Sequence, residues 1–144
     1  MAYAKTTVLI NRPISEVFEF ILNGENNKLW RPTVVDIKRN SDKLTSVGVG
    51  TVFLQGMKGP NGMRINADYE IIECDRDKNI SFQVLNGPYR ALGIFKFESH
   101  DKGSMVTFSM SEATSITEEP DRTRHLQRVV DSLTNLKKYF ELEM

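Results

Sequence analysis

The sequence predicts a single α+β domain in which a strongly curved, seven-stranded antiparallel sheet wraps around one long C-terminal helix. Two observations predict this fold. From residue 33 onward, strand-like runs follow one another with only short turn segments between them, and links this short join neighbouring strands in antiparallel. The last stretch, residues 119–143, then changes to helical periodicity. This helix is the only predicted element long enough to cover the apolar face of the sheet.

The N-terminal part supplies the first strand and two short helices. Residues 4–10 end in three β-prone apolar side chains and read as a strand that stops before Pro13. Apolar residues then recur at spacings of three and four, which predicts a helix over 14–22 that ends at Gly24. A second, shorter helical turn is expected over residues 25–30.

Turn-forming residues separate the six strands that follow. Between residues 63 and 72 apolar and polar side chains alternate, which gives the sheet one dry face, including Tyr69, and one wet face. In the inverted register Arg64 and Asp68 would pair inside a polar cavity, and burying the polar side chains of that face makes it the less favourable alternative. The predicted strands are 33–39, 49–57, 63–74, 80–86, 90–98 and 104–114.

The terminal helix carries one apolar stripe. Glu119 and Pro120 suit its first turn, and Lys138 lies near its far end, which agrees with the helix dipole. At 1.5 Å per residue, about 24 residues make a rod of roughly 36 Å, which can cross a whole sheet. The stripe consists of Leu126, Val129, Val130, Leu133, Leu136 and Phe140.

We expect a cavity between the sheet and the terminal helix. A twisted sheet around a straight rod need not close tightly, and glycines such as Gly56 and Gly93 mark places where bends deepen the curve. The inward positions are mostly apolar, as ligand pockets usually are. Trp30 either caps the cavity mouth or anchors the short helical turn. The predicted lining consists of Trp30, Phe53, Gln55, Met57, Ile65, Ala67, Tyr69, Phe82, Val84, Phe95, Phe108, Met110, Val129, Val130 and Leu133.

Composition and charge exclude several classes of function. At 144 residues the chain accommodates one domain, residues 1–144. Nineteen basic residues balance nineteen acidic ones, so no general field attracts nucleic acid or an acidic membrane. No run approaches the roughly 18 apolar residues of a spanning helix, and no signal peptide is recognisable, so we expect a cytoplasmic protein without membrane insertion. The single cysteine, Cys74, fits a reducing compartment.

Five segments carry a family resemblance: VLINRPISEVFEFILNGENNKLWRP, VGVGTVF, NGPYRALGIFKFE, DKGSMVTFSM and LTNLKKYFELE. Together, over about residues 3–143, they resemble the START-like (SRPBCC) superfamily and, within it, the polyketide cyclase/dehydrase family. The resemblance implies a helix-grip fold with a deep cavity for a hydrophobic molecule. Members of the superfamily use this cavity for lipid carriage, for sensing hormones or metabolites, or for cyclising and dehydrating polyketides, and the fold does not choose among them.

A cyclase or dehydratase needs an acid or base inside the cavity. Tyr69 is the first candidate, and the alternative is a core tyrosine whose hydroxyl has a structural partner. Glu112 shares the parity of Met110 and either points into the cavity mouth or is exposed at a frayed strand end. His125 either titrates near the opening or is a surface histidine. No spacing of histidines and cysteine indicates a metal, no nucleophile motif is present, and we expect no cofactor.

Three hypotheses for the function remain. The leading one is a protein that binds a small hydrophobic or aromatic molecule, lipid or polyketide-like, between the sheet and the terminal helix. The second is a cyclase or dehydratase that uses Tyr69 with Glu112 or His125, and the third is a protein-interaction module. Outward-facing Leu92 and Ile94 either form a homodimer contact or are isolated surface residues.

Overall fold

The computed structural model describes residues 2–40, 46–59, 61–86, 90–101, 103–112 and 119–142, with the backbone only at residues 119–122 and 142. The predicted strand end at residues 113–114 and the last predicted helical residue, 143, lie outside these ranges. The elements are β1 (Ala2–Ile10), α1 (Ile14–Leu22), a short 3₁₀ segment η1 (Gly24–Asn26), α2 (Asn27–Trp30), β2 (Val34–Arg39), β3 (Val52–Lys58), β4 (Arg64–Asn66), β5 (Tyr69–Asp75), β6 (Asn79–Val84), β7 (Leu92–His100), β8 (Gly103–Glu112), α3 (Glu119–Asp131) and α4 (Leu133–Leu142).

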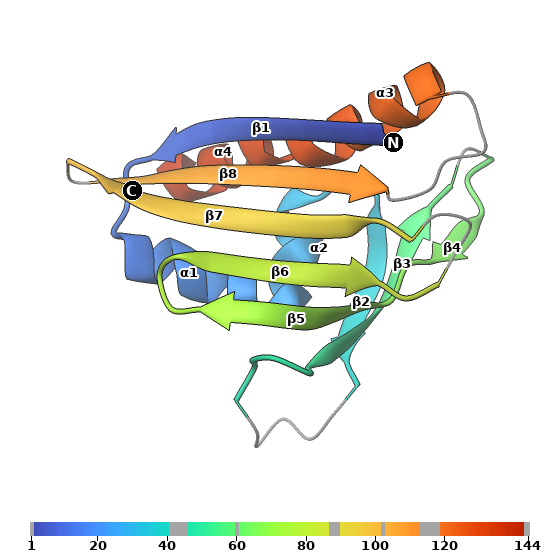
Figure 1. Ribbon diagram of the computed structural model, residues 1–144, viewed down its shortest axis with the longest axis horizontal. Coiled ribbons are helices and arrows are strands. Elements are labelled where there is room, and N and C mark those ends of the chain that lie inside the picture. Colours follow the sequence, from blue (N-terminus) through green and yellow to red (C-terminus); the bar gives the residue numbers. More distant parts are fainter. Residues whose placement is uncertain are drawn as a thin grey trace.

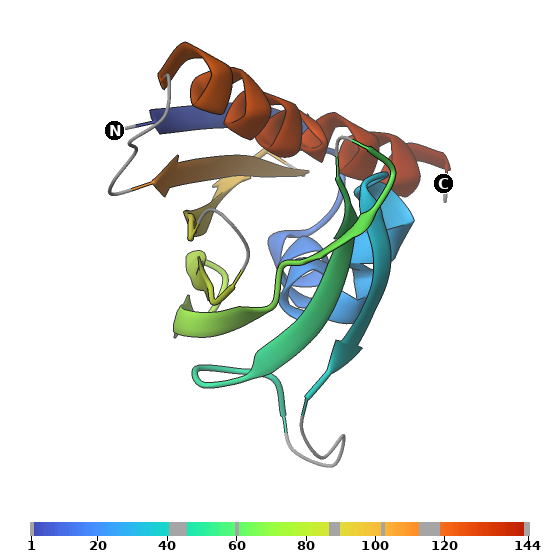
Figure 2. The same cartoon turned by 90° about the vertical axis from the view of Figure 1, so that its right-hand side faces the viewer.

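The strands form one antiparallel sheet in the order β1-β8-β7-β6-β5-β3-β2, with short β4 paired to β3 (Figure 1). Figure 2 shows this sheet curving around α1 and α2, while α3 and α4 run along β1 and β8. Helix α2 contacts α4, so the two short helices fill the concave side beneath the C-terminal pair. The predicted α+β fold, a curved antiparallel sheet gripping a C-terminal helix, is confirmed. Within the described ranges no helix is both long and apolar enough to span a membrane.

The predicted strand 63–74 is wrong as a single strand, because Ala67 and Asp68 interrupt it between β4 and β5. Asp68 takes over hydrogen bonds that a regular ladder would make: its Oδ1 accepts from the Gln55 backbone N–H at 2.9 Å, and its own N–H donates to Asn86 Oδ1 at 3.0 Å. The predicted alternation therefore holds near Tyr69 but not at Met63, which is 69% exposed. Hydrophobic periodicity does not reveal a polar side chain that replaces a backbone group in the hydrogen bonds of a sheet.

The C-terminal helix is also divided, at Ser132, into α3 and α4. The Ser132 N–H bonds to Val129 O at 3.2 Å, and the Ser132 hydroxyl donates to the same carbonyl at 2.5 Å. A serine that bonds back to a carbonyl in this way bends a helix. The predicted stripe still continues across the break: Leu126, Val130, Leu133, Leu136 and Phe140 are buried, and Val129 is half-buried.

Aromatic rings fill the interior between sheet and helices. Phe95 on β7 stacks on Phe108 on β8 with ring centroids 4.2 Å apart, and Trp30 on α2 packs edge-on against both at 6.2 and 6.3 Å. Across the sheet the Phe82 ring lies over Gly93, where an added Cβ would collide with it. On the opposite face of β7, Leu92 and Ile94 are half-buried in the single chain.

Candidate ligand-binding site

The structure places every predicted lining residue at a buried or half-buried position. The half-buried ones are Met57, Ile65, Ala67, Val84 and Val129, and the buried ones are Trp30, Phe53, Gln55, Tyr69, Phe82, Phe95, Phe108, Met110, Val130 and Leu133.

The buried rings contact one another where the sequence predicts open space. Phe53 stacks on Tyr69 at 5.3 Å, and Tyr69 packs on Phe82 at 4.9 Å, which continues the aromatic cluster along the sheet. Their role in binding a ligand stays a prediction.

A groove of about 530 Å³ lies elsewhere, between α1, the segment at residues 46–47 and the end of β5. Sequence analysis missed this groove, because residues 46–47 come from a segment without hydrophobic period. The groove is lined by Phe18, Glu19, Leu22, Asn23, Ser46, Val47, Cys74 and Arg76. Phe18 connects it to the interior, since its ring packs edge-on against buried Phe97 of β7 at 5.2 Å.

Three buried polar side chains meet inside the aromatic interior. Asn27 on α2 donates from Nδ2 to the Tyr69 hydroxyl at 3.0 Å and to Gln55 Oε1 at 3.2 Å. Gln55 is 2% exposed, Asn27 5% and Tyr69 6%. We call these three residues the polar triad. Sequence reasoning found Tyr69 and Gln55 but missed Asn27, although Asn27 and Trp30 are three residues apart and so share a helical face.

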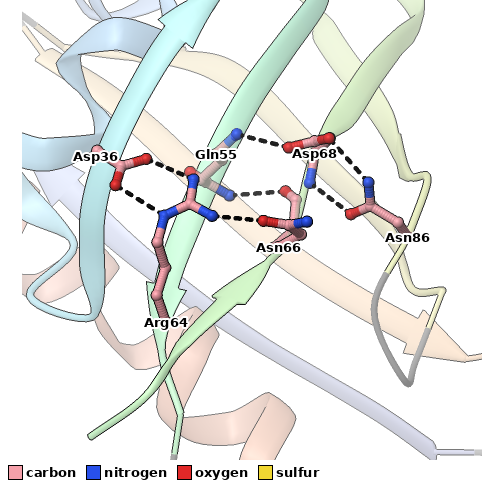
Figure 3. Close-up of polar contacts among 7 residues, drawn as sticks. Asp36, Gln55, Arg64, Asn66, Asp68 and Asn86 are labelled. Carbon is pink, nitrogen blue, oxygen red and sulfur yellow. Dashed lines mark hydrogen bonds and ion pairs between the residues drawn. The ribbon is translucent and has the colours of Figure 1, made fainter.

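The surrounding backbone fixes the polar triad. Gln55 donates from Nε2 to the carbonyl of Ala67 at 3.2 Å, so the interruption between β4 and β5 orients the glutamine (Figure 3). Gly24 lies directly against the Tyr69 hydroxyl, and a Cβ there would collide with the phenolic oxygen. Only glycine at this position leaves room for the hydroxyl to reach Asn27.

Arg31, the residue after α2, is also buried, with 5% of its surface exposed. It lies four residues after Asn27, so both side chains leave the same side of the helical turn. Its guanidinium carbon is 5.9 Å from the centre of the Trp30 ring, a cation–π arrangement. Burial lowers the pKa of Arg31, and the Tyr69 hydroxyl partly opposes that change. Sequence analysis did not single out Arg31.

Tyr69 remains a neutral phenol at physiological pH. Burial raises the pKa of Tyr69 far above its ordinary value, while Arg31 and the Asn27 hydrogen bond lower it to a smaller extent. In the described part of the chain its hydroxyl bonds only to Asn27, which donates to it. The phenolic proton is therefore available to an acceptor, and Tyr69 can act as a hydrogen-bond or proton donor rather than as a base.

The other two catalytic candidates do not join Tyr69. Glu112 ends β8 opposite Ala2 and is 3% exposed, so the frayed, exposed alternative is wrong. His125 lies exposed on α3. Within the described ranges neither side chain bonds to the Tyr69 hydroxyl. The catalytic roles of all three stay predictions.

The outer side of the same strands carries a separate polar network (Figure 3). Arg64 on β4 donates to both carboxylate oxygens of Asp36 on β2, at 2.8 and 2.7 Å, and to Asn66 at 2.5 Å. This places Arg64 at the surface, so the alternative in which it pairs with Asp68 inside a cavity is wrong. The hydrogen bond from Arg64 lowers the pKa of Asp36. The network ties β2 to β4 across Gly56 of β3, where an added Cβ would collide with the guanidinium.

Comparison with known proteins places this architecture in a family. Residues 1–141 match the family described as polyketide cyclase / dehydrase and lipid transport. Among solved structures, a START superfamily protein from Mycobacterium smegmatis is similar with a TM-score of 0.84 at 9% identity, over 100% of both chains. A protein from Thermus thermophilus has a TM-score of 0.75 at 17% identity, over 98% of each chain.

A plant structure has the same fold. Major latex-like protein 151 from Panax ginseng has a TM-score of 0.74 at 13% identity, over 96% of this chain and 97% of its own. No curated protein matches the sequence. At such identities the structures establish the helix-grip fold alone, and the match over nearly the whole chain establishes the family. The chain belongs to the polyketide cyclase / dehydrase and lipid transport family.

Proposed function

We propose that the protein binds a small, largely apolar molecule, aromatic or lipid-like, between the curved sheet and the C-terminal helices. The observation that carries this proposal is the polar triad of Asn27, Gln55 and Tyr69 inside an interior built of aromatic rings. Burying polar groups costs free energy unless they are hydrogen-bonded, and in this triad the proton of the Tyr69 hydroxyl has no acceptor among the described residues. A few fixed polar groups among apolar and aromatic walls are instead the composition of a ligand site.

The groove beside α1 supports a route to this interior. One side of the Phe18 ring lines the groove, and the ring also packs against Phe97 in the interior. On the groove side, the guanidinium of Arg76 lies over the Phe18 ring at 5.2 Å, and Glu19 of α1 forms an ion pair with Arg76. A ligand enters by displacing Phe18 and comes to rest against the rings that now fill the space beside the polar triad.

A neutral fluorescent probe tests the proposal. Titration with N-phenyl-1-naphthylamine, whose emission rises in apolar surroundings, is expected to saturate at one probe per chain. Val84→Trp adds bulk to a half-buried position opposite Tyr69 and is expected to weaken binding, whereas Val35→Trp on exposed β2 surface leaves it unchanged. Thermal melts show that both variants are folded. Absence of saturable binding, or equal loss in both variants, contradicts the proposal.

A second candidate function, proton transfer on a carbonyl compound, is favoured by the neutral phenol of Tyr69. In enolisation the Tyr69 O–H would donate its proton to the carbonyl oxygen while water or hydroxide from solvent removes the α-proton, and the phenol would regain its proton when the enol returns to the ketone. Exchange of the α-protons of 2-tetralone in D2O, followed by NMR, is expected to be faster with the protein than without it. The acceleration should disappear in Tyr69→Phe. Exchange no faster than in buffer contradicts the enzymatic function and leaves binding intact.

A further inference from the structure

Arg31 is a buried cation without a counter-charge. Within the described part of the chain, its guanidinium forms no ion pair and no hydrogen bond, and its one specific contact is the face of the Trp30 ring. Taking a charge out of water is expensive, and protein interiors normally compensate it with a carboxylate or with several hydrogen bonds. The face of one ring compensates only a small part. The guanidinium nitrogens of Arg31 are not among the fully enclosed atoms without a partner, so they keep a small contact with solvent, but no described residue supplies a counter-charge.

The polar groups around Arg31 are also short of acceptors. The Tyr69 hydroxyl accepts from Asn27, which lies one helical turn before Arg31, and its own proton has no acceptor among the described residues. The indole N–H of Trp30, the residue before Arg31, is buried without a partner in the same ranges. Both amide N–H bonds of Asn27 are directed at oxygens already present, on Gln55 and Tyr69. The Arg31 guanidinium, the Tyr69 hydroxyl and the Trp30 indole are therefore donors without an acceptor among the described residues, and a group with negative charge would satisfy them best.

We propose that the ligand is an apolar acid whose carboxylate pairs with Arg31, with the Tyr69 hydroxyl donating a hydrogen bond to the same group. This proposal rests on the proposed function and names its ligand class. A planar guanidinium matches a carboxylate with two parallel hydrogen bonds, and such charge-assisted bonds are strongest away from water. The aromatic walls select an acid with an apolar body over a small hydrated anion.

A matched pair of probes tests the charge requirement directly. Calorimetric titrations at neutral pH compare 2-naphthoate with its uncharged methyl ester, which has the same ring system, and with acetate, which has the carboxylate alone. The wild-type protein is expected to bind 2-naphthoate at least about tenfold more tightly than the ester, and acetate hardly at all. In Arg31→Met the acid should lose this preference while the ester binds as before. Arg128→Met, on exposed α3 surface, is the control and should keep it.

The outcomes separate the two proposals. If the ester and N-phenyl-1-naphthylamine bind but the acid is not preferred, or if Arg31→Met keeps the preference, the acidic ligand is excluded while binding of apolar molecules stands. If acetate binds as tightly as 2-naphthoate, Arg31 is a small-anion site and the proposal is overturned. If no probe binds, the proposed function itself fails. The comparison of acid and ester on the wild-type protein needs no variant, so it remains decisive if Arg31→Met fails to fold. In that case Arg31→Lys replaces Arg31→Met. Its preference for 2-naphthoate over the ester should be reduced, because lysine lacks the planar fork of the guanidinium.

Discussion

Two arginines of this protein show opposite solutions to placing a charge in a fold. Arg64 lies at the surface with 45% of its side chain exposed and forms a bidentate pair with Asp36. Arg31 is buried, and among the described residues its guanidinium has one specific contact, with the face of the Trp30 ring. An exposed pair contributes little to stability but fixes strand positions, whereas a buried unpaired charge reduces stability. An unpaired charge at this position is what the proposed carboxylate ligand would neutralise.

Replacing Arg31 should therefore stabilise the protein, and this is the largest effect we expect. Arg31→Met removes the charge and keeps an apolar chain of similar length; replacing buried ion pairs by apolar side chains is neutral or stabilising by up to about 4 kcal/mol, and a charge without a partner should gain in the same direction. Urea denaturation measures the free energy of unfolding, with Arg31→Lys as the control that keeps the charge. Added 2-naphthoate should stabilise the wild type and not Arg31→Met. A marked loss of stability in Arg31→Met would show that the guanidinium is already paired in the free protein.

The sequence predicted the features that depend on hydrophobic periodicity and missed those that depend on individual polar side chains. Alternation and turn residues predicted the antiparallel sheet, because strand side chains have a period of two regardless of their partners. They also placed Tyr69 and Gln55 inward. The breaks at Asp68 and Ser132 were missed, because in both a polar side chain bonds to backbone groups, and hydrophobic period does not record such bonds.

Asn27 and Arg31 were missed for another reason. They belong to a four-residue helix and the position after it, a segment too short to establish which side faces the core. Their inward direction comes from the contacts of Trp30 with Phe95 and Phe108, which the tertiary fold alone creates. Hydrophobic periodicity therefore could not predict that Arg31 contributes a positive charge to the candidate site.

A substitution at Gly24, in the buried region, should have an intermediate effect on stability. Gly24→Ala places a methyl group against the Tyr69 hydroxyl and should lower the free energy of unfolding by about 1–3 kcal/mol, as overpacking of a core does. Tyr69→Phe removes the colliding oxygen at a cost of about 1 kcal/mol for the hydrogen bond from Asn27. The double variant should then be more stable than the sum of the single changes predicts. Strict additivity in urea denaturation would mean that Gly24 does not position the phenol.

Removing the exposed ion pair between Arg64 and Asp36 should have the smallest effect on stability, and this effect should depend on pH. The hydrogen bond from Arg64 lowers the pKa of Asp36 below its unfolded value, so the pair stabilises the fold above that unfolded value. As pH falls below about 4, through the lowered pKa, Asp36 becomes protonated and this contribution is lost. Asp36→Asn should accordingly melt slightly below the wild type at neutral pH, and the difference should vanish on acidification and shrink in high salt. If the difference in melting temperature persists at low pH, Asp36 acts through hydrogen bonds that do not need its charge. Arg64 and Arg31 would then differ in burial but not in the presence of a charged partner.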